Sequence, residues 1–174
     1  ASFAHSCNTV FAPLGVRVGG AKLVEESEQY GFNAPPTLYN AAALALTQPP
    51  ESTIPNPLTD ETEVAVSAIG QGEVLATPLE MASVSQTIAN GGVRSPTAMV
   101  KAPALAGDYP DVEVVPPDIA DQVEKMMIEV VAWFTAFAPA DKPKLAVAVM
   151  VVNAPGDGGT VAAPIARQIL DAGL

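Results

Sequence analysis

The sequence is poor in positive charge. It has eight lysine and arginine residues against 19 aspartate and glutamate residues, for a formal net charge of -11. Proteins that bind nucleic acids or anionic membrane surfaces neutralise phosphate groups with clustered cations, and this sequence has no such cluster. The composition therefore argues against a nucleic-acid partner and against docking on a membrane surface.

Cysteine, histidine and long apolar runs are also scarce. The single cysteine, Cys7, excludes an internal disulfide bond, and with one histidine, His5, we expect no metal site and no cofactor. The longest apolar run, residues 145–152, has the length of a strand rather than of a membrane span, and no signal-peptide pattern opens the sequence. What remains is 174 residues, 49% hydrophobic and 16% charged, which is typical of one folded globular domain.

The N-terminal third combines helix signals with a long irregular stretch. Residues 2–14 are predicted to hold a helix broken near Asn8 or Pro13, and residues 21–30 a second helix that a glycine ends. Residues 33–60 contain six prolines. In a compact domain so long an irregular segment is typical of functional surface.

The middle of the chain has the clearest helix signals. Thr77 is predicted to cap a helix that begins at Pro78, and Glu80 to complete a capping box with it. A tight glycine loop at residues 70–72 precedes this helix, and the glycine pair at residues 91–92 ends it. The buried face of the helix is expected to consist of Met81, Val84 and Ile88.

The C-terminal part alternates helix and strand signals. Asp118 is predicted to cap a helix, and two strands at residues 133–138 and 144–152 to form a hairpin, the second strand apolar on both faces. The buried face of this helix is expected to consist of Ile119, Val123, Met126, Met127 and Val130. A closing C-terminal helix is expected to bury Ala162, Ile165, Ile169 and Leu170. The predicted fold class is α+β, with helices packed on an antiparallel sheet.

One junction conflicts with this pattern. The helix that ends in Val130 and Val131 runs directly into the strand that begins with Ala132, with no glycine, proline, asparagine or aspartate between them. A helix needs a cap and a change of direction before a strand can pair. We therefore expect that a segment is missing from this sequence between Val131 and Ala132; the alternative is a shorter helix with a sharp bend near Ala132.

Three stretches, in this order along the chain, resemble penicillin-binding proteins. Residues 6–11 (SCNTVF) resemble the Ser-x-Asn motif of these enzymes and the helix that follows it. Residues 67–92 (SAIGQGEVLATPLEMASVSQTIANGG) resemble the loop and helix that precede the last catalytic motif in the class B type. Residues 133–153 (WFTAFAPADKPKLAVAVMVVN) resemble the closing β-hairpin of the transpeptidase sheet. A bare Ser-x-Asn triplet is common, but the long middle stretch is specific, and residues 1–174 are identified as the C-terminal part of one such domain, present only in part.

The resemblance implies acyl transfer by a serine nucleophile. An enzyme of this family attacks the terminal D-Ala-D-Ala amide of a peptidoglycan stem peptide, and β-lactam antibiotics acylate the same serine. It also implies a membrane-anchored, extracytoplasmic parent protein, whose anchor is not in this sequence. By resemblance Ser6 is the middle-motif hydroxyl, which can pass a proton towards the leaving nitrogen, and Asn8 presents an amide to the substrate. A spacing of two residues directs both side chains towards one cleft if the loop is extended, with Cys7 pointing away.

Two of the three family motifs do not occur in these residues. None of the five lysines follows a serine at the spacing of Ser-x-x-Lys, and none begins Lys-Thr-Gly. In the family the first motif lies upstream of Ser-x-Asn, and the Lys-Thr-Gly strand lies just before the strand that residues 133–138 resemble. The second position coincides with the junction at Val131 and Ala132. We therefore expect the chain alone to be inactive and to need the missing parts of the same parent chain.

Other interpretations remain open. Ser6 and Asn8 could simply cap a helix, the residues 70–72 loop could bind an anion, and Asp60, Glu61 and Glu63 fit a solvated loop better than a metal site. The fold could serve as a non-catalytic β-lactam-binding or sensor module. A secreted hydrolase built on Cys7 and His5 is a third, different possibility.

Overall fold

The computed structural model describes residues 2–3, 6–36, 47, 49–97, 109–128, 135–139, 142, 144–149 and 158–173. In chain order its elements are α1 (Asn8–Val18), α2 (Gly20–Tyr30), α3 (Glu61–Ser67), α4 (Pro78–Ala89), β1 (Val93–Arg94), β2 (Val112–Glu113), α5 (Pro117–Ile128), β3 (Thr135–Ala138), β4 (Leu145–Ala148) and α6 (Gly158–Gly173). Helices combined with small antiparallel sheets make an α+β fold, as predicted.

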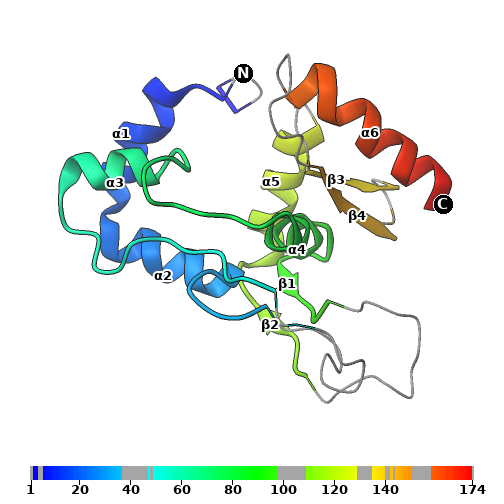
Figure 1. Ribbon diagram of the computed structural model, residues 1–174, viewed down its shortest axis with the longest axis horizontal. Coiled ribbons are helices and arrows are strands. Elements are labelled where there is room, and N and C mark those ends of the chain that lie inside the picture. The colour runs from blue at the N-terminus through cyan, green and yellow to red at the C-terminus, as the bar shows by residue number, and fades with distance from the viewer. Residues whose placement is uncertain are drawn as a thin grey trace.

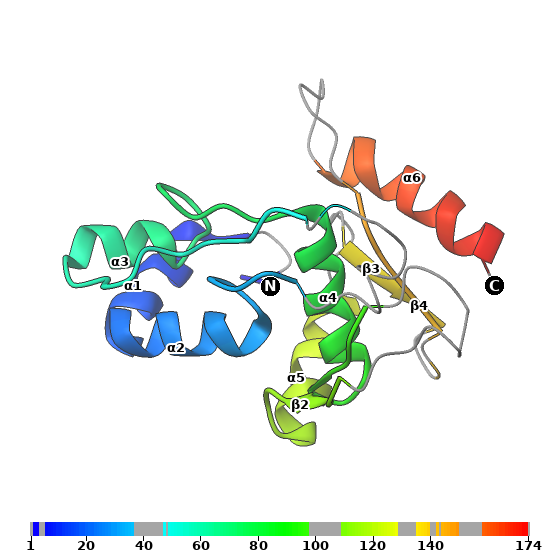
Figure 2. The same cartoon turned by 60° about the horizontal axis from the view of Figure 1, so that its bottom comes forward.

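The helices form two groups around a central helix. Figure 1 shows α1, α2 and α3 together on one side, α4 and α5 in the middle, and β3, β4 and α6 on the other side. The view in Figure 2 preserves this order. Helix α4 contacts α2 as well as β3 and β4, so it joins the two groups.

The β3–β4 hairpin lies between α4 and α6 (Figure 2), and both helices contact both strands. The strands pair antiparallel, with Thr135 opposite Ala148 and Ala138 opposite Leu145. Val147 and Val149 pack in one buried cluster with the α6 residues Ala162, Ala166 and Leu170. The apolar character of β4 on both faces is explained by this position, because each face is covered by a helix.

A second core holds the first three helices together. It consists of Val24 of α2, Val64 of α3, and Ile54 and Leu58 from the proline-rich stretch between them. The stretch thus contributes core residues although its described part contains no helix or strand, only the isolated bridge of Thr53 with Leu75. Its irregular backbone was predicted, but its role in the core was not.

Helix α4 begins as expected, but its capping box is only half formed. The Thr77 hydroxyl oxygen accepts from the Glu80 amide at 3.1 Å, and Pro78 occupies the first helical position. The Thr77 amide does not bond to the Glu80 side chain; it donates instead to the Ser52 hydroxyl at 3.0 Å. The Glu80 side chain therefore takes no part in the cap, and the residue is buried, with 3% of its surface exposed.

The predicted buried faces of three helices were wrong in part. In α4 the residues below 2% exposure include Ser85 and Thr87, whose hydroxyls donate to carbonyls of their own helix, while Met81 and Val84 are only partly buried. The expected core residues Ile119 and Met126 of α5 and Ile165 and Ile169 of α6 are each at least 40% exposed, and the buried α6 positions are Ala162, Ala166 and Leu170. A helix buries the side that its neighbour covers, and here small alanines allow close packing on the hairpin.

The helix boundaries show three further differences. Helix α1 continues through Pro13 rather than breaking there. Asp118 lies inside the first turn of α5, which begins at Pro117. Residues 61–67 form helix α3 rather than a solvated loop, because the Asp60 carboxylate caps it by accepting from two backbone amides, at 2.9 and 3.1 Å.

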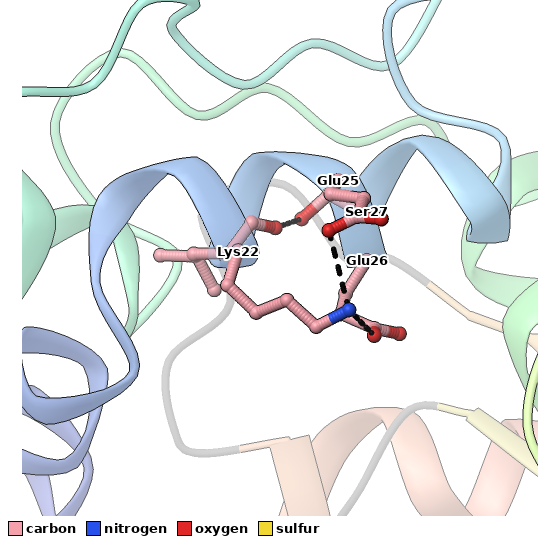
Figure 3. Close-up of polar contacts among 5 residues, drawn as sticks. Lys22, Glu25, Glu26 and Ser27 are labelled. Carbon is pink, nitrogen blue, oxygen red and sulfur yellow. Dashed lines mark hydrogen bonds and ion pairs between the residues drawn. The ribbon is translucent and has the colours of Figure 1, made fainter.

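Helix α2 exposes a small ion-pair network. The Lys22 ammonium contacts Glu25 at 3.2 Å and Glu26 at 2.8 Å, and the Ser27 hydroxyl donates to the Leu23 carbonyl (Figure 3). Hydrogen bonds to Glu26 and then to Glu25 raise the pKa of Lys22. Such exposed pairs contribute little to stability, so Lys22 belongs to the solvated face of the helix.

Several expectations fall outside the described residues. They concern His5, the apolar residue Val130, the junction between Val131 and Ala132, and the outer ends of both predicted strands.

Candidate functional site

The Ser6-Cys7-Asn8 motif lies at the N-terminus of α1. Asn8 is the first helical residue, and Cys7 occupies the cap position with an extended backbone. The Cys7 carbonyl accepts from the amides of Val10 and Phe11, at 2.9 and 3.1 Å, and so begins the helical ladder. The motif is therefore attached directly to a regular element.

The loop before the helix is turned rather than extended. Ser6 has a φ of 48°, in the left-handed region that non-glycine residues seldom adopt. An extended loop was the condition under which both side chains were expected to face one cleft, and Ser6 does not meet it. The turn is closed by two backbone hydrogen bonds, from the Ser6 amide to the Phe3 carbonyl at 3.0 Å and from the Cys7 amide to the Ser2 carbonyl at 3.1 Å.

The side chains of Ser6 and Asn8 are both exposed, whereas Cys7 is partly buried. Within the described part of the chain, neither the Ser6 hydroxyl nor the Asn8 amide makes a hydrogen bond, and α1 has no side-chain cap. The alternative interpretation, in which the side chains of these residues cap a helix, therefore has no support in the geometry. A hydroxyl and an amide, two residues apart, remain available to a bound molecule.

Helix α1 packs against α3 and against the second core. Gly15 packs so closely against α3 that an added Cβ would lie 2.1 Å from the Cβ of Ala68, and Val16 packs against the second core. The motif thus projects from a helix that is held by α3 and by the core.

The glycine loop at residues 70–72 is a structural turn. Gly70 and Gly72 have φ values of 69° and 70°. The amides of Ile69, Gly70 and Gln71 donate to carbonyls at the end of α3, so they are engaged within the chain. The anion-binding interpretation of this loop is not supported.

Sequence reasoning missed a pocket beside α4 that holds charged side chains. Its volume is about 160 Å³, and its lining includes Glu80 of α4, Arg94 of β1 and Tyr109. The Glu80 Oε1 atom and the Arg94 Nε atom are buried, and neither has a hydrogen-bond partner among the residues that the structure describes. Burial raises the pKa of the Glu80 carboxyl, and the positive charge of Arg94 opposes this in part.

Gly31 leaves room for the side chains of both Glu80 and Arg94. It ends α2 with a φ of 113°, and a Cβ there would lie 2.6 Å from Glu80 Oε1 and 2.8 Å from Arg94 Nη1. The capping-box pattern concealed this arrangement, because it assigned Glu80 to a local bond. No pattern in the sequence links residues 31, 80 and 94.

A metal centre has no basis in the described part of the chain, where no group of three or more histidine, cysteine, aspartate or glutamate side chains is placed to bind an ion. Among the same residues no helix is long and apolar enough to cross a membrane.

Comparison with known proteins gives a consistent result. The family model for the penicillin binding protein transpeptidase domain matches residues 1–132 and 129–171. The peptidoglycan D,D-transpeptidase PbpA of Mycobacterium tuberculosis is 33% identical over 218 residues, which cover 99% of this chain and 43% of that protein. The protein of the same name from Mycolicibacterium smegmatis is 34% identical over 219 residues, with the same coverage.

A solved structure agrees with these sequence matches. The penicillin G acyl-enzyme complex of penicillin-binding protein A from M. tuberculosis superposes with a TM-score of 0.78 at 33% identity, covering 99% of this chain and 47% of that one. The chain therefore spans less than half the length of the relatives that it matches.

Proposed function

The chain belongs to the penicillin-binding protein transpeptidase family, as its sequence resemblance predicted, and on this premise we propose that its parent protein cross-links peptidoglycan stem peptides through a serine acyl-enzyme. The chain itself is part of a transpeptidase domain. The observation that carries the proposal is the match to D,D-transpeptidases over 99% of the chain at about one-third identity. The proposed partners are stem peptides and β-lactams, and the proposed location is extracytoplasmic, on a membrane-anchored parent.

Ser6 and Asn8 are the proposed catalytic residues of this chain. The exposed Ser6 hydroxyl can accept a proton and donate another, so it would relay a proton to the nitrogen that leaves during acylation. The Asn8 amide would hold the amide bond of the substrate. This role is supported by their exposure and by the absence of any competing hydrogen bond to either side chain in the described residues.

The nucleophile must come from elsewhere in the parent. No Ser-x-x-Lys occurs in these 174 residues, and a hydroxyl without a paired base is a weak nucleophile. We therefore expect the chain alone to form no covalent adduct with a fluorescent penicillin. Rapid labelling of Ser6 in the chain alone would contradict the proposed role.

The acylation rate of the full-length parent tests the proposal. Fluorescent penicillin should label the parent, and Ser6→Ala should slow the labelling by about 10²- to 10⁴-fold, the range of general acid–base catalysis. Cys7→Ala, which alters the residue between the two proposed catalytic side chains, should leave the rate unchanged. A folded parent that is not labelled would contradict the proposal. If Cys7→Ala abolishes the activity of the parent while Ser6→Ala leaves the labelling rate unchanged, a cysteine hydrolase is favoured instead.

A non-catalytic β-lactam sensor is the second candidate. It would bind penicillin without joining peptides. A parent that is labelled by penicillin but forms no cross-links from purified stem-peptide substrate would favour this alternative, whereas cross-linking lost in Ser6→Ala would favour the enzyme.

We further propose that an internal segment carrying Lys-Thr-Gly is missing between Val131 and Ala132. Two observations support this. The family model matches the chain in two pieces that meet at residues 129–132, and the alignment with the M. tuberculosis relative extends over 218 positions although the chain has only 174 residues. Relatives therefore have residues that this chain lacks.

Peptide mapping of the natural parent tests the missing segment. Trypsin cleaves after Lys125 and Lys144 but not after Lys142, which precedes Pro143, so a contiguous chain would yield a peptide of residues 126–144. Detection of that peptide would refute the proposal. A peptide that begins at Met126 and continues beyond Val131 with residues other than Ala132 and Trp133, together with a separate peptide that begins with Thr-Gly, would support it.

A further inference from the structure

Two phenylalanines flank the Ser6-Cys7-Asn8 motif in the sequence and contact each other. Phe3 precedes it and Phe11 lies one helical turn after it, and their ring centroids are 6.1 Å apart with an interplanar angle of 79°. This edge-to-face arrangement is a favourable geometry for an aromatic pair. Both side chains are partly buried. We refer to this pair as the phenylalanine clasp.

The clasp closes the same turn that the backbone closes. The Ser6 amide donates to the carbonyl of Phe3, and the Phe11 amide donates to the carbonyl of Cys7. Each ring is therefore attached to a residue that hydrogen-bonds to the motif. The ring contact joins the two ends of the loop, from Phe3 to the first turn of α1.

Ser6 needs such external support. Its φ of 48° lies in a region that costs a residue with a Cβ free energy, so an isolated loop would relax towards extended backbone. In the described part of the chain no side-chain hydrogen bond holds Ser6 or Asn8 in place. The position of the Ser6 hydroxyl therefore depends on the backbone turn, and any interaction that stabilises the turn also positions it.

We infer that Phe3 and Phe11 are positioning residues that hold the Ser6 hydroxyl in its reactive arrangement. This inference rests on the proposed acyl-transfer function. The clasp does not touch the reacting atoms; it acts by keeping Ser6 in its left-handed turn. Without the ring contact the loop spends time in extended conformations, in which the hydroxyl is displaced from the leaving nitrogen.

The rate of penicillin acylation in the full-length parent measures this effect. Phe3→Leu and Phe11→Leu should each slow acylation by roughly two- to tenfold, the rate equivalent of one aromatic pair. Because both substitutions break the same contact, the double variant should be no slower than the slower single variant. Val10→Ala, next to Phe11 on an exposed position of α1, is the matched control and should leave the rate unchanged.

A second measurement separates positioning from general destabilisation. In a Ser6→Ala background, Phe11→Leu should cause no further loss of the residual acylation rate, because there is no hydroxyl left to position. Restoration of the ring by Phe11→Tyr should recover most of the rate. If Phe11→Leu prevents folding, Phe3→Leu decides the question alone, since Phe3 lies outside the helix.

Three outcomes would overturn the inference: additive losses in the double variant, an equal loss in Val10→Ala, or a loss by Phe11→Leu that persists in the Ser6→Ala background. They differ from failure of the proposed function, in which the unaltered parent itself is not labelled and both proposals fall. If the parent is labelled and the phenylalanine variants are acylated at its rate, only the positioning role of the clasp is refuted.

Discussion

The glycine pair that ends α4 provides a sharp test of the structure. Gly91 and Gly92 both have positive φ, at 64° and 90°. A Cβ on Gly91 would meet no atom within 4 Å, whereas a Cβ on Gly92 would lie 2.0 Å from the carbonyl oxygen of Val115. Substitution by alanine at these neighbouring positions therefore changes the backbone preference in both cases but creates a steric clash in only one.

The expected magnitudes follow from this difference. A left-handed conformation costs alanine about 1–2 kcal/mol, partly offset by about 0.4–1 kcal/mol from the lower entropy of the unfolded chain, so Gly91→Ala should destabilise by about 1 kcal/mol. In Gly92→Ala the Val115 carbonyl must also move away. That movement strains the bonds by which the Gly92 carbonyl accepts from the Val114 and Val115 amides, at 2.9 and 3.3 Å. Each is worth about 0.5–1.5 kcal/mol, so Gly92→Ala should cost about 2–4 kcal/mol in total.

Urea unfolding followed by circular dichroism measures the two free energies. At roughly 2–4 °C of melting temperature per kcal/mol in a chain of this size, thermal melts should also separate the variants. Equal destabilisation by the two substitutions would refute the reasoning, because it would mean that the segment before α5 does not pack against Gly92. A neutral Gly91→Ala would show instead that residue 91 does not require positive φ.

Three further predictions concern buried or capping groups. Burial raises the pKa of Glu80 above its ordinary value of 4.5, with Arg94 opposing in part, so the stability that Glu80 contributes below pH 4.5 is lost as the pH rises through the raised pKa. Glu80→Gln should abolish this pH dependence and be the more stable form at pH 7. An unchanged slope of unfolding free energy against pH in Glu80→Gln would contradict this prediction. Asp60→Ala should destabilise by about 1 kcal/mol in urea unfolding because two backbone amides lose their acceptor, whereas Asp60→Asn should retain most of the stability. Ser52→Ala should cost about 1–3 kcal/mol by the same measurement, because the Thr77 amide loses its acceptor; a cost no larger than that of an exposed serine would argue against this tertiary cap.

Local chemistry in the sequence was sufficient for much of the fold. Thr77 before Pro78 predicted the start of α4, and the glycines at 31 and 91–92 predicted the ends of α2 and α4, because each signal acts through atoms a few residues away. Two strand patterns, residues 133–138 and 144–152, separated by a short proline-containing connection, predicted the hairpin. The family could also be identified without coordinates, since a family pattern is a property of residue order, whereas the roles of Ser6 and Asn8 stay a prediction.

Only the tertiary structure decided which groups are buried and what they meet. Glu80 occupies a capping-box position in the sequence, yet the Thr77 amide that it would have bonded donates to Ser52, 25 residues earlier. Glu80 is buried instead, where the charge of Arg94 influences its pKa. Helix α6 could bury its isoleucines or its alanines on periodicity alone, and the hairpin selects the alanines. Periodicity defines the faces of a helix, but burial depends on which face a distant element covers, and that information is spread over residues that meet only after folding.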